Sequence, residues 1–163
     1  MVVTELLAPE RATIAPPGSV DRVLTFRNVH NWLKDGNDEA MFRAFFRALK
    51  PGGLLGVTEH RAAPGTTVAT MKDSGYVTEA HVIALAEKAG FRLLARSEIN
   101  ANPNDKKQYP DGVWSLPPVL RTCKQVASAK RDACEAPYRR IGESDRMTLK
   151  FVKPSTRVAG QRE

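Results

Sequence analysis

Runs of apolar and β-branched residues that end in polar ones recur along the chain. Residues 20–28 (VDRVLTFRN) and 53–60 (GLLGVTEH) both have this pattern, which is typical of strands in the core of a parallel sheet. Residues 91–99 (FRLLARSEI) predict a third strand. Residues 146–152 (RMTLKFV) alternate between polar and apolar positions and predict a fourth.

Helical spacing separates these runs. Asn37 is placed to cap a helix that ends at the turn 50–53 (KPGG), and Thr78 to cap a second helix that runs to Ala89 and stops at glycine. A third helix is predicted from Pro118 to about Glu135, because proline is tolerated in the first turn. The apolar stripe of the first helix consists of Met41, Phe42, Phe45, Phe46 and Leu49.

The predicted order is β, α, β, α, β, loop and helix, β, which belongs to the α/β class. Residues 1–19 are rich in proline and small side chains and predict an irregular approach, residues 20–153 form one domain, and residues 154–163 form a basic tail. The polar loop 100–117 contains Tyr109 and Trp114. Loops of that length often cover or bind a ligand.

Two phrases carry a resemblance to a known family. SVDRVLTFRNVHNW and FFRALKPGGLLGVTEH are similar to the second half of class I S-adenosylmethionine-dependent methyltransferases, in which a strand that begins near an aspartate is followed by a helix and a KPGG turn. Asp21 and Lys50 have the matching spacing, and NVHNW and TEHRA resemble a group of predicted bacterial methyltransferases. The resemblance covers about residues 18–153 and implies a partial Rossmann-like, mostly parallel sheet with a terminal antiparallel strand.

The resemblance lacks one part. Family members carry an upstream glycine-rich loop of the GxGxG type and an acidic residue that holds the cofactor ribose. Here the only upstream glycine is Gly18, and VVTELL with Glu5 is the one candidate remnant of a neighbouring strand. We therefore expect a carboxyl-terminal part of a methyltransferase domain that is inactive alone. The strand 20–28 is expected to leave an open hydrophobic edge that pairs with a second copy.

Ligands of open α/β sheets bind beyond the carboxyl ends of the strands. At the end of the first strand, the resemblance implies that Asn28, Val29 and Trp32 line the methionine part of S-adenosylmethionine. His30 lies among them and is a candidate catalytic base for removing a proton from a small-molecule acceptor.

Glu59 and His60 follow at the end of the second strand and are further candidate bases. Adjacent residues of a strand face opposite ways, so we expect only one of the two to point into the site.

Net charge and cysteine content limit which partners and metals the chain is expected to bind. The net charge is +7, but residues 1–120 carry 14 basic and 13 acidic side chains and residues 121–163 carry 11 and 5. The excess lies along a helix and tail without interleaved aromatic residues, so we expect a solvated surface and no nucleic acid partner. Cys123 and Cys134 have no metal-ligand spacing, so no metal site is expected. One helix over both would keep them as thiols, whereas a chain that doubles back between them would allow a disulfide.

Two other functions are compatible with the sequence. A non-catalytic α/β module would bind a partner through the open strand edge or the basic surface near the carboxyl terminus. A nicotinamide-dependent oxidoreductase is favoured less, because a terminal antiparallel strand suits methyltransferases better. No apolar run approaches the roughly 18 residues that a membrane-spanning helix needs.

Overall fold

A four-stranded sheet with the order β1-β2-β4-β3 is the frame of the protein. The computed structural model describes residue 10 and residues 12–155. β1 (Val20–Phe26) runs parallel to β2 (Leu49–His60), and β4 (Arg146–Val152) lies antiparallel between β2 and β3 (Arg92–Ser97). β1, β2 and β3 therefore point one way and β4 the other, which confirms the predicted α/β fold with a terminal antiparallel strand.

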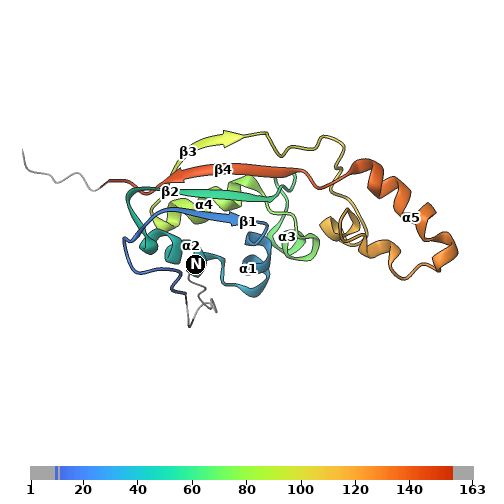
Figure 1. Cartoon of the computed structure of the whole chain (residues 1–163), viewed down its shortest axis with the longest axis horizontal. Coiled ribbons are helices and arrows are strands. Elements are labelled where there is room, and N and C mark those ends of the chain that lie inside the picture. The colour runs from blue at the N-terminus through green and yellow to red at the C-terminus, as the bar shows by residue number, and fades with distance from the viewer. Residues whose placement is uncertain (1–9, 11, 156–163) are drawn as a thin grey trace, which may run out of the picture.

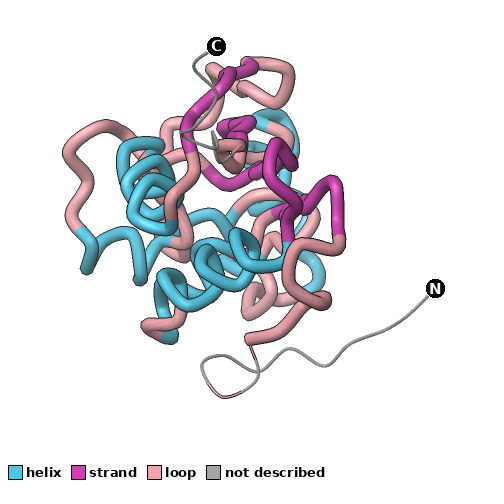
Figure 2. The backbone as a smooth tube through the Cα atoms, turned by 90° about the vertical axis from the view of Figure 1, so that its left-hand side faces the viewer, coloured by secondary structure: helices cyan, strands magenta, loops and turns pink. Residues whose placement is uncertain are grey.

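The helices pack on one face of the sheet (Figure 1), and Figure 2 shows the strands gathered toward one side of the molecule. α2 (Asp38–Ala48) and α4 (Glu79–Ala89) are the two helices that the apolar spacing predicts. The Thr78 hydroxyl accepts a hydrogen bond from the His81 amide, as its predicted capping role requires. The Asn37 side chain makes no such bond.

Two further helices, α1 (Val29–Asp35) and α3 (Val68–Ser74), were not predicted from the sequence. Each has seven residues, too few for a repeating apolar stripe to stand out. Each ends at a glycine in the left-handed conformation, Gly36 and Gly75, with φ of 74° and 72°.

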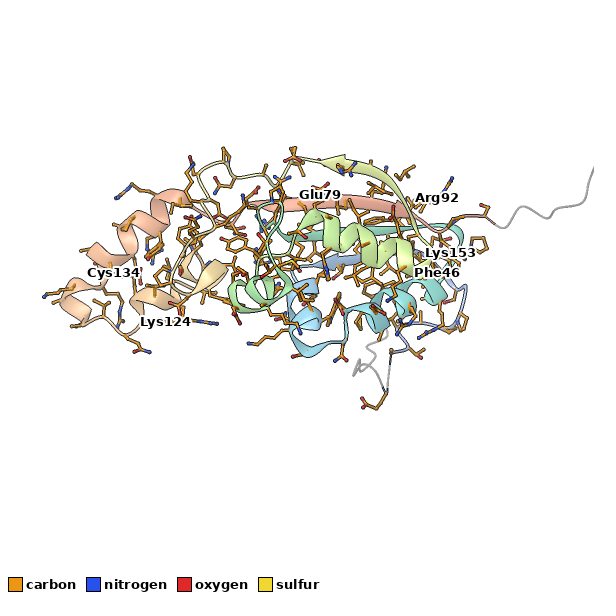
Figure 3. The ribbon with its side chains drawn as sticks, turned by 180° about the vertical axis from the view of Figure 1, so that it is seen from behind. Phe46, Glu79, Arg92, Lys124, Cys134 and Lys153 are labelled. Carbon is orange, nitrogen blue, oxygen red and sulfur yellow. A yellow bond between two sulfur atoms is a disulfide. The ribbon has the colours of Figure 1, made fainter. Side chains whose placement is uncertain are left out.

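The helix predicted from Pro118 to about Glu135 is wrong. Short 3-10 turns at Gly112–Ser115 and Arg121–Cys123 precede α5, which spans Ser128–Ile141. The chain reverses between them, so the Cα atoms of Cys123 and Cys134 lie 5.8 Å apart and the two sulfurs form a disulfide. α5 lies beyond the carboxyl end of β2 (Figure 1), and Cys134 sits on this outlying part (Figure 3).

The hydrophobic core lies between the sheet and helices α1, α2, α3 and α4. Leu55 and Val57 of β2 and Leu149 and Phe151 of β4 are at most 1% exposed and point toward the helices. The predicted stripe on α2 meets them there. Its buried members are Met41, Phe42, Phe45 and Leu49, and Phe46 is partly buried.

β1 is an edge strand, as the sequence predicts, because among the described residues it pairs with β2 alone. Buried and exposed side chains alternate along β1, however. The expectation that both faces of this strand are buried in the core is therefore wrong within the described structure. Val23 and Thr25 face the helices, whereas Leu24 is 63% and Phe26 58% exposed. The Leu24 side chain covers Gly56, at which a Cβ would lie 2.7 Å from Leu24 Cδ2.

The expectation for Glu5 and most of that for the tail 154–163 lie outside the described residues. Lys50 donates a 2.8 Å hydrogen bond to Asp21, so the pair that marks the family spacing meets at the starts of β1 and β2. None of the described helices has the length and hydropathy to cross a membrane.

Candidate functional site

The carboxyl ends of β1 and β2 open into a cavity of about 320 Å³. Its remaining walls come from the segment 113–119 and from residues 143–146, which lead into β4. This is the position that open α/β sheets use for ligands. The lining residues are Phe26, Arg27, Asn28, His30, His60, Val113, Trp114, Pro117, Pro118, Val119, Glu143, Ser144 and Arg146.

A buried carboxylate holds His30 in place. Nδ1 of His30 lies 2.9 Å from Oε1 of Glu59, and the His30 backbone amide donates to Oε2 at 3.2 Å. Oε1 also accepts from the backbone amide of His60 at 2.8 Å. Because a carboxylate oxygen accepts, Nδ1 of His30 donates and Nε2 is left with its lone pair. The His30 ring packs edge-on against Trp114, 5.9 Å between centroids.

His60 and Glu59 face opposite sides of the sheet, as adjacent strand residues must. The His60 side chain lines the cavity, and its ring centroid lies 5.3 Å from that of His30. Its Nδ1 lies 2.5 Å from the hydroxyl of Ser144. Burial lowers the pKa of His60 from 6.5 to about 4, aided by the nearby charges of Arg27 and Arg146 and against the opposing charge of Glu59.

The structure brings four of the six candidate residues together. Asn28, His30 and His60 line the cavity, and Glu59, which is fully buried, supports His30 from the helix side of the sheet. Glu59 therefore contributes although it does not point into the cavity, because α1 places His30 over it.

Val29 and Trp32 do not line the cavity, which corrects the sequence expectation. Val29 is 0% exposed and belongs to the core, and Trp32 packs edge-on against Phe45 of α2 at 5.5 Å between centroids. The reason is that residues 29–35 form a helix. Its apolar positions turn toward the core while residues 28 and 30 stay at the strand end.

Sequence reasoning missed the residues contributed by the last third of the chain. Arg27 follows β1, and Glu143, Ser144 and Arg146 reach the same cavity from a segment more than 110 residues away. No local pattern marks them. The pairing of His60 with Arg146 across β2 and β4 is what brings them there. Trp114 of the predicted covering loop does line the cavity.

An ion-pair cluster holds this last segment in position. Asp145 accepts hydrogen bonds from Arg61 at 2.8 Å and from the backbone amide of Asn102 at 3.0 Å, and it pairs with Lys107 at 2.9 Å. Burial acts to raise the pKa of Asp145, but the bonds from Arg61 and Lys107 outweigh it and hold that pKa at about 2. Residues 144 and 146, on either side, are thereby fixed at the cavity.

His30, Glu59 and His60 also form a set of possible metal ligands, which the sequence did not predict. Each offers one ligand atom, and these atoms lie within 4.8 Å of one another. Two imidazoles and a carboxylate suit transition metals such as Zn²⁺ and Fe²⁺. In the present geometry, however, the oxygens of Glu59 already accept three N–H bonds. A carboxylate that accepts from a histidine ring also orients that histidine as a base, so the same contact serves a metal-free site.

No protein-family description matches the chain, and no curated relative matches its sequence. Solved structures do match its fold. The match to the cyclase SpnF covers 87% of this chain and 53% of the SpnF chain, at 19% sequence identity and a TM-score of 0.57. A putative sarcosine dimethylglycine methyltransferase from Galdieria sulphuraria covers 86% with 56% of its own, at 14% identity and a TM-score of 0.53.

A putative methyltransferase from Bacillus halodurans covers 88% of this chain with 74% of its own, at 14% identity and a TM-score of 0.51. The chain thus spans little more than half the length of the first two structures. These likenesses show a methyltransferase-type fold over most of the chain, as the sequence resemblance implied.

Proposed function

We propose that this chain forms the acceptor side of an S-adenosylmethionine-dependent methyltransferase, with His30 as the base that removes a proton from the acceptor. The carrying observation is the Glu59–His30 pair at the carboxyl end of β1, which leaves Nε2 of His30 free to accept a proton beside the cavity. The methyltransferase-type fold supports S-adenosylmethionine as the methyl donor, and the Glu59–His30 pair supports the proton transfer.

The described residues fit one end of the cofactor. Asn28 lies at the carboxyl end of β1, makes no capping bond with its side chain and lines the cavity, so its amide is available to the methionine part. A glycine-rich turn and a ribose-binding acidic residue are absent from the described residues before β1. The contacts that we assign among the described residues are those with the methyl-carrying end. When bound, S-adenosylmethionine supplies an electrophilic methyl group on a sulfonium.

The residues of this chain orient the acceptor and take its proton. A hydroxyl or amine beside His30 would donate a hydrogen bond to Nε2, and the proton would pass to that nitrogen as the nucleophile gains its methyl group. Glu59 favours the resulting imidazolium because its carboxylate stays hydrogen-bonded to Nδ1. Trp114, Pro117 and Pro118 form one wall of the cavity, against which an acceptor can pack.

A nuclear magnetic resonance titration of the full chain with S-adenosylhomocysteine tests this proposal. We expect the amide and side-chain signals of Asn28, His30 and Trp114 to shift, because they surround the proposed position of the sulfur. Adenosine alone should leave these signals in place, since the methionine end carries the contacts.

The matched pair of variants is His30→Gln and His81→Gln. His81 also contacts a carboxylate, with Nε2 3.1 Å from Asp38, but it lies away from the cavity. His30→Gln should reduce methyl transfer by about 100-fold or more, the usual contribution of a general base, and His81→Gln should not. Unchanged signals at the cavity with saturating S-adenosylhomocysteine would refute the proposal.

The open edge of β1 favours a second candidate, a binding module that pairs with another chain. The outer backbone of β1 is unpaired within the described residues, and Leu24 beside it is 63% exposed. Sedimentation velocity over a range of concentrations should then show a dimer that Leu24→Lys dissociates. Ile99→Lys, a control at an 81% exposed residue beyond β3, should leave it intact. A monomer at every concentration excludes this candidate.

A further inference from the structure

The cavity contains two guanidinium groups beside its histidines. Arg27 and Arg146 both line it, Arg27 from the end of β1 and Arg146 from the start of β4. Arg146 lies opposite His60 in the antiparallel ladder, so the two side chains leave the sheet on the same face.

One donor in this group has no partner. Nε of Arg146 is buried and makes no hydrogen bond in the structure. Its Nη2 pairs with Glu143, so the guanidinium is held by one nitrogen while another donor remains unsatisfied. An unpaired buried N–H is unfavourable because it has lost its hydrogen bonds to water, so such a group in a cavity calls for a ligand atom that accepts from it.

Arg27 is held in an unfavourable backbone conformation at the cavity. Its φ is 54°, in the left-handed region that non-glycine residues rarely adopt, while its amide still donates to Thr58 at 2.8 Å. Strain of this kind persists where the side chain must be aimed at a site. Within residues 12–155, Arg27 has no ion-pair partner.

The acidic groups near the cavity do not cancel these charges. Glu59 is fully buried and already accepts three N–H bonds, two of them from the backbone and one from His30. Glu143 is engaged with Arg146 and has a side chain that is 55% exposed. An anion that entered the cavity would therefore meet the unpaired Nε–H of Arg146 and the charge of Arg27, which pairs with no carboxylate of residues 12–155.

We propose that the acceptor carries an oxyanion, a carboxylate or a phosphate, which Arg27 and Arg146 bind while its nucleophilic group lies at His30. A guanidinium binds two oxygens of one carboxylate or phosphate side by side, which fixes the orientation of a ligand as well as its position. The hydroxyl of Ser144 lies in the same lining and can complete the shell. Oxyanion binding stands on these contacts, and the identification of the ligand as a methyl acceptor rests on the proposed function.

The test compares three aromatic probes with the full chain by calorimetry near neutral pH. 4-Hydroxybenzoate carries a carboxylate, phenyl phosphate carries a phosphate, and 4-hydroxybenzamide is neutral. We expect one or both anions to bind at least about tenfold more tightly than the amide, because charge-assisted bonds are roughly twice as strong as neutral ones. The stronger of the two anions identifies the oxyanion.

Two variants and one control locate the binding. Arg27→Gln and Arg146→Met, which keeps most of the packing stem, should each remove the preference for the anion. Arg22→Gln, an exposed arginine near the other end of β1, should keep it. Equal binding of the neutral amide, or a preference that survives both variants, overturns the proposal.

A competition experiment separates acceptor from cofactor as the source of the oxyanion. The anionic probe should still bind in the presence of S-adenosylhomocysteine, whose own affinity should be unchanged in Arg146→Met. Displacement of the probe, with loss of S-adenosylhomocysteine binding in both arginine variants, would assign the arginines to the cofactor carboxylate and refute the acceptor assignment. Anion preference without any binding of S-adenosylhomocysteine would count against the proposed function alone.

Discussion

Glu59 fixes the tautomer of His30: its Oε1 lies 2.9 Å from Nδ1, and a second oxygen accepts the His30 backbone amide. The proton of the neutral ring is therefore on Nδ1. In Glu59→Gln, the amide group presents donors where the carboxylate accepted, so we expect part of the His30 population to move its proton to Nε2. Two-bond proton–nitrogen correlation spectra of the imidazoles measure the tautomer directly.

The control for this spectrum is His81, which contacts Asp38 through the other ring nitrogen, Nε2. Its tautomer should be opposite to that of His30 and should not respond to Glu59→Gln. The variant should also lose about 1 to 3 kcal/mol of stability, because buried backbone amides lose their acceptor. A His30 ring that carries its proton on Nε2 in the unmodified protein contradicts the proposed base.

The fold was predictable to the extent that apolar spacing determines it. Apolar residues spaced so that they fall on one face of a strand or helix predicted four elements that the structure contains. These are the strands near residues 20–28 and 146–152 and the helices α2 and α4. α1 is too short for such a signal, and its absence from the prediction led to the wrong placement of Val29 and Trp32. The sequence left the state of Cys123 and Cys134 open, and the chain reversal near residues 124–127, which spacing alone treats as part of one helix, brings them into a disulfide.

The candidate site was predictable only where local sequence marks a strand end. Asn28, His30 and His60 follow directly from that rule and do line the cavity. Arg146 and Ser144 could not be found in this way, because long-range pairing of β4 with β2 brings them to His60. Such pairing depends on the assembled sheet and leaves no trace in any short window of sequence.

Protonation of His60 should destabilise the fold in weak acid. Its pKa is 6.5 when unfolded and about 4 when folded, so the unfolded chain binds the extra proton first. Stability should be complete above pH 6.5, fall by about 3 kcal/mol as the pH approaches 4, and change no further below that through this group. Urea unfolding midpoints across this range measure it.

His60→Asn removes the titrating group and should flatten that part of the profile. His81→Asn, a histidine outside the cavity, should leave the slope in place. An unchanged slope in His60→Asn would show that another group is responsible.

Arg27→Gly should raise stability and impair the site at once. Glycine adopts a φ of 54° without the steric cost that arginine bears, so we expect about 1 kcal/mol of stabilisation. The same variant removes the cation and should lose anion binding. In Arg22→Gly, at a β1 position that pairs with Leu54 of β2, glycine should instead destabilise by about 0.5 to 1 kcal/mol. Thermal unfolding of the two variants measures whether their stabilities change in these opposite directions.

The disulfide should stabilise the region around α5 more than the sheet. It closes a loop between residues 11 positions apart, for which loss of chain entropy predicts about 3 kcal/mol. In the double variant Cys123→Ser/Cys134→Ser, native-state hydrogen exchange of residues 121–141 should quicken, while the amides of β2 and β4 keep their protection. Equal quickening across the sheet would mean that α5 unfolds together with the core.

The decisive measurement is a crystal structure of this chain with S-adenosylhomocysteine, which shows whether the cavity holds the cofactor beside His30. We expect the sulfur in the cavity beside Asn28, with a gap for the acceptor between that sulfur and Nε2 of His30. A ligand bound elsewhere, or a sulfur shielded from His30 by the wall of the cavity, would contradict it.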